Sequence, residues 1–138
     1  MRHAANRWAD AVTAILDCSF DPKTVSMWAH AIGVGEGTLR DRCRVARCRP
    51  KRSLDLARVL RAVVQSRRHG WDPFNLLDIV SERTMKNLLK RGGVIHLLST
   101  SSAPTVHQFL LAQRFVTNRP AVDAVVERCA AVPDACGD

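Results

Sequence analysis

The sequence predicts an all-α fold in a single domain that spans residues 1–138. Apolar residues recur three and four positions apart through most of the chain, which is the spacing of one helix face. Proline, glycine and capping residues divide the chain into segments of helical length. No run of four to eight residues alternates between apolar and polar side chains as a strand would. With 138 residues, of which 46% are apolar, the chain can bury a core without disulfides or metal ions.

The first segment predicts a helix over residues 4–16, because Trp8, Val12, Ile15 and Leu16 recur at helical spacing. Charged residues interrupt this segment where a signal peptide needs an unbroken apolar stretch. The chain also has no apolar run long enough to span a membrane. We therefore expect a soluble, cytoplasmic protein that has no membrane partner.

Residues 24–48 predict two helices joined by a tight turn. Thr24 caps the first helix, which ends at Gly33, and glycines on both sides of Val34 permit the turn. The second helix covers residues 36–46, and its spacing places Leu39, Cys43 and Ala46 on the inner face. The same spacing places a set of charged residues on the outer face: Arg40, Asp41, Arg44 and Arg47.

The remaining segments predict a linker helix, two shorter helices and two C-terminal helices. Arg49-Pro50 ends the helix before it, and a long helix follows over residues 51–67. Asp72-Pro73 starts a short helix over residues 74–79, and Ser81 caps a helix over residues 82–91. The predicted elements after it are an apolar segment at 94–98, a polar loop at 99–102, and helices over residues 104–116 and 120–131. The apolar side chains of these last two helices, which include Phe109, Phe115 and Val125, either complete the core or form a homodimer face.

The basic side chains are concentrated in one part of the chain. The formal net charge is +8, and residues 36–68 contain eleven Lys and Arg against three Asp and Glu. This segment accounts for the whole net charge, so the rest of the chain is neutral. A basic segment on a neutral body is typical of a surface that binds phosphate groups, which indicates a nucleic-acid partner. The alternative is a solvated, arginine-rich helix surface.

Residues 24–62 resemble the first helix-turn-helix and the linker helix of the AraC-type transcriptional regulators. The resemblance is carried by Ala29, by Ile32-Gly33, by the Thr38-Leu39 pair with Arg42, and by Pro50 at the entry to the linker helix. The chain departs from the family pattern at four positions: Gly35 and Gly37 replace serines, Cys43 replaces an aromatic residue, and Ser53 stands where tyrosine is common.

The same family carries two helix-turn-helix units, and an internal similarity predicts a second unit at residues 72–93. Residues 34–41 align with residues 80–87, with identical Val, Glu and Thr positions. The second copy has Asp78-Ile79 in place of a glycine-containing turn. Its candidate contact residues are Arg83, Lys86, Asn87 and Lys90. The resemblance extends at most over residues 24–94, and it implies no sensor domain in this chain.

The resemblance implies that the helix at 36–46 enters the major groove of double-stranded DNA. Arginine can bind guanine with two hydrogen bonds, a carboxylate can accept one from cytosine, and glycine permits close approach of the backbone. The candidates for base contacts are Glu36, Gly37, Arg40, Asp41 and Arg44. The candidates for phosphate contacts, which flank this face or lie at the junction with the linker helix, are Thr38, Arg42, Arg47, Arg49, Lys51 and Arg52.

No motif of a catalytic site accompanies these residues. The chain lacks HExxH, a phosphate-binding P-loop, GxSxG and a spaced acidic pair, so we expect no catalytic residues and no enzyme activity. Its five cysteines have spacings that fit neither a zinc site nor a disulfide framework, so no metal or cofactor is predicted.

Taken with the basic segment and the resemblance at residues 24–62, the sequence predicts a sequence-specific transcription regulator. Two alternatives stay open: an adaptor that binds an acidic protein partner, and a DNA-binding protein of a phage or mobile element.

Overall fold

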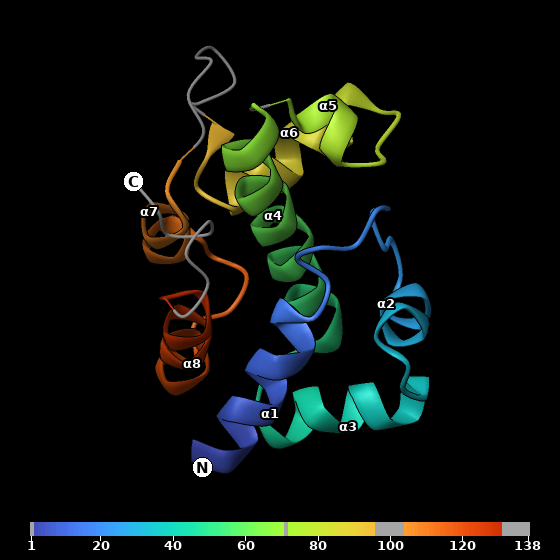
Figure 1. The fold of residues 1–138 in the computed structure, drawn as a ribbon, viewed down its shortest axis with the longest axis vertical. Coiled ribbons are helices and arrows are strands. Elements are labelled where there is room, and N and C mark those ends of the chain that lie inside the picture. Colours follow the sequence, from blue (N-terminus) through green and yellow to red (C-terminus); the bar gives the residue numbers. More distant parts are fainter. Residues whose placement is uncertain (1, 71, 96–103, 131–138) are drawn as a thin grey trace.

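The computed structural model describes residues 2–70, 72–95 and 104–130, and it is all-α over these residues, as predicted (Figure 1). In chain order its helices are α1 (Arg2–Thr13), α2 (Val25–Ile32), α3 (Glu36–Val45), α4 (Pro50–His69), α5 (Pro73–Leu76), α6 (Glu82–Arg91), α7 (Val106–Ala112) and α8 (Arg119–Ala130). Among the described residues, no helix is long and apolar enough to cross a bilayer.

The centre of the fold is α4, against which α1, α2, α3, α5 and α7 pack (Figure 1). Residues 53–64 of this helix are all buried. Helical spacing places Leu54 and Val64 on one inner stripe, but the residues between them lie in the core as well. The buried surface of α4 is this broad because helices surround it instead of lying along one side of it.

Two arginines of α4 are buried and bind groups from other parts of the chain. Arg58 donates from Nε and Nη2 to the two carboxylate oxygens of Asp21, at 2.9 and 2.6 Å, and both side chains are buried. Arg61 donates to the carbonyl oxygens of Cys18 and Leu76, at 2.9 and 2.8 Å. Burial lowers the pKa of Arg61, while Asp21 acts in the opposite direction. These two charges hold the connection between α1 and α2 against α4, so they must be removed from the expected phosphate-binding surface.

The caps at the helix ends follow the sequence closely. The Thr24 hydroxyl accepts a hydrogen bond from the Met27 amide at 3.0 Å, and Ser81 accepts one from Thr84 at 3.2 Å.

In contrast, α5 ends at Leu76 and does not continue to residue 79 as predicted. The Asp78 amide donates to the buried Asp21 carboxylate at 2.8 Å, which takes the backbone out of the helical pattern.

The C-terminal helices complete the core, which was the first of the two alternatives. Of the seven side chains concerned, Val126 is partly buried and six are buried: Val106, Phe109, Leu110, Phe115, Val122 and Val125. The helix predicted over residues 104–116 is shorter, because the Gln113 side chain binds the amides of Phe115 and Val116 and starts an extended segment. Of the predicted apolar segment, Val94 is buried, while residues 96–98 and the predicted loop at 99–102 lie outside the described residues.

Candidate nucleic-acid interface

The α2–turn–α3 unit has the predicted geometry. The turn consists of residues 33–35, and Gly33 has a φ of 76°, in the left-handed region that glycine adopts without strain. The Val34 amide donates to the Ala29 carbonyl oxygen at 3.0 Å, which closes the end of α2. Figure 1 shows α2 nearly end-on and α3 lying across the view, so the two helices cross steeply. This is the arrangement of a helix-turn-helix pair.

The two faces of α3 differ as its periodicity predicts. Leu39 and Cys43 are fully buried against the core, and Ala46 is buried just after the helix ends. Burial raises the pKa of the Cys43 thiol, which therefore stays neutral, as a core residue does. The predicted base-contact residues all lie on the exposed face: Glu36, Gly37, Arg40, Asp41 and Arg44. The periodicity of the sequence thus predicted correctly which face of α3 is exposed.

The charged side chains of this face pair with one another along the helix. Arg40 donates to Glu36 at 2.9 Å, and Arg44 pairs with Asp41. All four side chains are at least 44% exposed. Exposed ion pairs of this kind contribute only about 0.2–1 kcal/mol each, so a ligand can replace them at little cost.

A continuous basic groove leads from this face around the turn between α3 and α4. One part of it, of about 470 Å³, is lined by residues of α3 that include Gly37, Arg40 and Arg44. The adjoining part, of about 370 Å³, is lined by Arg52 and by residues 115–118. Arg47, Cys48 and Arg49 line both parts. We call the combined feature the basic groove.

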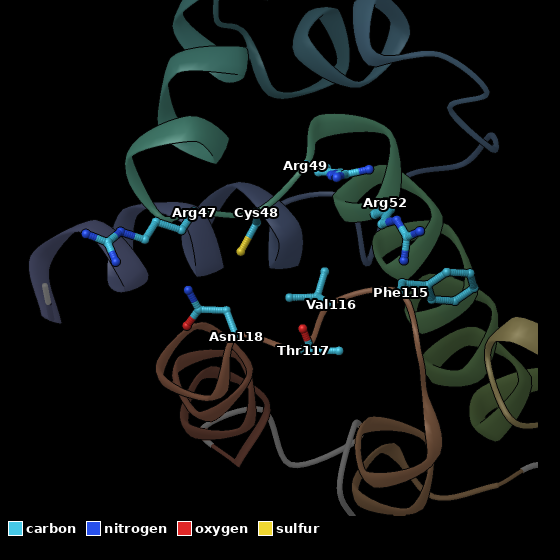
Figure 2. A pocket seen from close by; sticks show the side chains of 8 residues that line it. All are labelled: Arg47, Cys48, Arg49, Arg52, Phe115, Val116, Thr117 and Asn118. Atoms are coloured by element: carbon cyan, nitrogen blue, oxygen red, sulfur yellow. The ribbon is translucent and has the colours of Figure 1, made fainter.

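Three arginines of the basic groove have no ion pair or hydrogen-bond acceptor for their side chains within the described residues: Arg47, Arg49 and Arg52. Figure 2 shows Arg47 on one side of the second part of the groove and Arg49 and Arg52 on the other, with Val116 and Thr117 between them. The positive charge at the rim is therefore not neutralised from within. Such a rim fits an extended polyanion better than a small compact anion.

Arg47 adopts a backbone conformation that non-glycine residues rarely adopt. Its φ is 60°, and no other non-glycine residue that the structure describes has a positive φ. The amides of Arg47 and Cys48 donate to the carbonyl oxygens of Arg44 and Cys43, at 3.0 and 2.9 Å, which is the Schellman pattern that usually has glycine at this position. A side chain here costs about 1–2 kcal/mol relative to an unstrained residue. Glycine would adopt this backbone conformation without that cost.

Gly37 is not required by the packing of the protein. A Cβ atom added to this residue would have no neighbour within 4 Å. The residue lies within the first turn of α3, where alanine would favour the helix by about 0.5–1 kcal/mol. The space above Gly37 is therefore open for a ligand that approaches the backbone of α3.

The walls of the groove are held by hydrogen bonds to the core. The indole N–H of the fully buried Trp8 donates to the Ser53 hydroxyl at 2.9 Å, and that hydroxyl donates to the Arg49 carbonyl oxygen at 2.8 Å. On the other wall, the Asn118 amide group donates to the Ala46 carbonyl oxygen at 2.9 Å. Burial raises the pKa of Cys48 to about 12, so the thiol stays protonated at neutral pH. The two walls of the groove are thus anchored to the core.

The predicted phosphate contacts do not form one cluster. Arg47, Arg49 and Arg52 lie together in the basic groove, whereas Thr38 and Arg42 line a separate cleft between α3 and α1. Lys51 donates to Asp55 at 2.8 Å, and the Asp55 side chain is only 2% exposed. Arg91 also lies 3.6 Å from this carboxylate, so two cations compensate the buried charge, and the Lys51 side chain is itself 67% exposed.

The predicted second unit is less complete than the first. Helix α6 has the predicted bounds, with Met85, Leu88 and Leu89 buried. Its candidate contact residues Arg83, Lys86, Asn87 and Lys90 are exposed, although Lys86 pairs with Glu82 at 3.1 Å. Helix α5 is a single turn of four residues, half the length of α2. Figure 1 shows α6 and α3 at opposite ends of α4.

Sequence reasoning missed the second wall of the basic groove and the α1 side of the cleft. Asn118 meets Ala46 across 72 positions in the chain, and no local pattern reports such a contact. His3 and Arg7 of α1 lie beside Thr38 and Arg42 in the cleft. They are an isolated pair in a neutral stretch of the sequence.

Comparison of this chain with protein-family models, with curated protein sequences and with solved structures finds no match.

Proposed function

We propose that this protein binds double-stranded DNA in a sequence-specific manner, as a transcription regulator, with α3 in the major groove. The observation that carries this proposal is the position of three unpaired arginines, Arg47, Arg49 and Arg52, at the end of an exposed and preformed helix face. An α-helix fits the major groove, and cations beside it bind the phosphates that fix its position. Fold and charge support the same partner.

Within this proposal, Arg40 and Arg44 exchange their carboxylate partners for guanine, while Glu36 and Asp41 accept from cytosine amino groups. Gly37 lets the backbone of α3 come close to the base edges, since nothing of the protein fills the space above it. Arg47, Arg49 and Arg52 bind one sugar-phosphate backbone along the basic groove. Lys51 is left out of this set because Asp55 holds its ammonium group.

The test is fluorescence anisotropy of the protein against a random-sequence duplex pool at several salt concentrations, followed by sequencing of the bound fraction. We expect affinity to fall steeply with salt, because each bound phosphate releases about 0.9 counterion. We also expect an enriched sequence motif. Absence of binding at low salt would overturn the proposal, and binding without an enriched motif would reduce it to non-specific association. Replacing the exposed basic residues of α6 with neutral residues in the same assay would show whether the second unit contributes to DNA binding.

Replacing Arg47 with glycine separates the stability of the protein from its binding. Glycine adopts a φ of 60° without strain, so Arg47→Gly should raise the free energy of unfolding by about 0.5–1 kcal/mol. The same change removes a phosphate contact and should weaken binding about 5-fold at 0.15 M salt. Urea denaturation and anisotropy measure the two effects. A stabilised variant with unchanged affinity would remove Arg47 from the interface.

Gly37→Ala, like Arg47→Gly, should raise the stability of the protein and weaken DNA binding, but for a different reason. The added methyl group meets no protein atom and favours the helix, so the free energy of unfolding should rise by about 0.5–1 kcal/mol. On the DNA the methyl group would occupy the space that a base edge needs, and affinity for the selected duplex should fall. Arg68→Ala, at the far end of α4, is the control for the binding assay. If Gly37→Ala binds as tightly as the parent protein, the backbone of α3 does not approach the bases.

A further inference from the structure

The cleft between α1 and α3 lies on the opposite flank of α3 from Arg40. Successive residues of a helix are about 100° apart, so Thr38 and Arg42, each two positions from Arg40, are about 200° from it around the helix. The cleft on this second flank has a volume of about 130 Å³, and His3 and Arg7 of α1 form its other wall. It shares Asp41 with the basic groove, but the arginines that line the two features differ.

The cleft contains cations that the fold does not use. The Nε atom of Arg42 is buried and has no hydrogen-bond partner within the described residues. Arg7 is exposed, and no ion pair among those residues involves it. Asp41 also lines the cleft, but its carboxylate is paired with Arg44. A buried donor without a partner is uncommon in folded proteins, and here it lies in a cleft that also contains an unpaired guanidinium.

The position of these cations is fixed by the core and not by a loop. Trp8 and Val12 of α1 are fully buried, and α1 packs against α3, α4 and α8. The backbone of Arg7 is therefore held beside α3 whether or not a ligand is present. A preorganised cation loses less freedom on binding than one on a mobile arm.

We infer that Arg7 and Arg42 bind phosphates of the DNA strand opposite the strand that Arg47, Arg49 and Arg52 bind. The major groove is about 12 Å wide and a helix with its side chains is about 10–12 Å across, so a helix in the groove has one backbone along each flank. The cleft faces the second backbone. This inference rests on the proposed function, and it assigns α1, which lies outside the helix-turn-helix, to the DNA-binding surface.

The experiment replaces single phosphates of the selected duplex with neutral methylphosphonates, one position at a time on each strand. Each duplex is titrated with the parent protein and with Arg7→Ala, Arg49→Ala and Arg68→Ala. Arg68 serves as the charge-matched control, because it lies 18 residues beyond Pro50 on α4, about 27 Å from the start of that helix, and pairs with the exposed Asp17. Arg7 has no ion pair among the residues that the structure describes, so its replacement tests binding and not folding.

We expect Arg7→Ala to weaken binding about 5-fold at 0.15 M salt and to reduce the salt slope by about 1. The affinity of Arg7→Ala should also no longer change when phosphates on one strand are made neutral. The affinity of Arg49→Ala should no longer change when phosphates on the other strand are made neutral. The inference is overturned if Arg7→Ala behaves like Arg68→Ala, or if both variants lose sensitivity on the same strand. Either result leaves DNA binding by α3 intact. Failure of the parent protein to bind any duplex overturns the proposed function itself.

Discussion

Asp21→Asn is expected to lower the free energy of unfolding by about 3–5 kcal/mol, a large part of the stability of a domain of this size. The Asp21 carboxylate binds both Nε and Nη2 of Arg58, and it also accepts from the Asp78 amide. Both partners of the ion pair are buried, so the neutral amide would leave the Arg58 charge without compensation away from water. Urea denaturation followed by circular dichroism measures the loss.

Two further variants distinguish the loss of this pair from a general effect of changing a charge. Asp17→Asn removes an ion pair with Arg68 in which Asp17 is 80% exposed, and it should change stability by less than about 1 kcal/mol. Replacing both buried partners, as in Asp21→Leu with Arg58→Met, should recover part of the stability, because no unpaired charge remains. A double variant that is no more stable than Asp21→Asn would show that the carboxylate acts mainly through the Asp78 amide.

Arg40→Ala is expected to cost about 1–3 kcal/mol of DNA-binding free energy and to relax the preference at one position of the selected motif. The side chain is 53% exposed and pairs with the exposed Glu36 on its own helix, so the fold loses little when it is removed. The expected loss comes from the base that the guanidinium would bind. Competition titrations with single-base variants of the selected duplex measure the change in preference.

Arg52→Ala provides the contrast to this result. Arg52 lies at the rim of the basic groove, where a phosphate contact carries no sequence information. Its replacement should weaken binding to every duplex by about the same factor, roughly 5-fold at 0.15 M salt. If both variants lose affinity uniformly and neither changes the preference, Arg40 contacts phosphate and the assignment of α3 residues is wrong.

Much of the fold could be predicted from local sequence, and the reason is visible at particular residues. Thr24 and Ser81 cap helices through hydrogen bonds to amides three residues away, so their signal lies within one turn. The bounds of α6 follow from Ser81 and Gly92 alone. The burial of Arg58 could not be predicted in this way. Its partner Asp21 lies 37 positions earlier, and a count of charges does not distinguish a cation in the core from one on the surface.

In the candidate site, too, the features that depend on local sequence could be predicted and those that depend on long-range packing could not. The periodicity of α3 predicts which residues are exposed, because only the helix itself determines that pattern. Sequence alone did not distinguish the arginines that line the basic groove from Lys51. What differs is that Lys51 donates a hydrogen bond to Asp55, which lies one turn later in the same helix. The second wall at residues 115–118 and the contribution of Arg7 depend on how distant helices pack.

The packing of α8 against α1 determines the order in which the protein can fold during synthesis. These two helices lie side by side, and Arg128 of α8 donates to Asp10 of α1 at 2.7 Å. Of the helices that the structure describes, α1 leaves the ribosome first and α8 last, so α1 stays partly uncovered until all the others have been made. We therefore expect slow amide hydrogen exchange to be shared by α1 and α8 as one cooperative unit. Helix α3, which packs on α1, acquires its final support only when α8 docks.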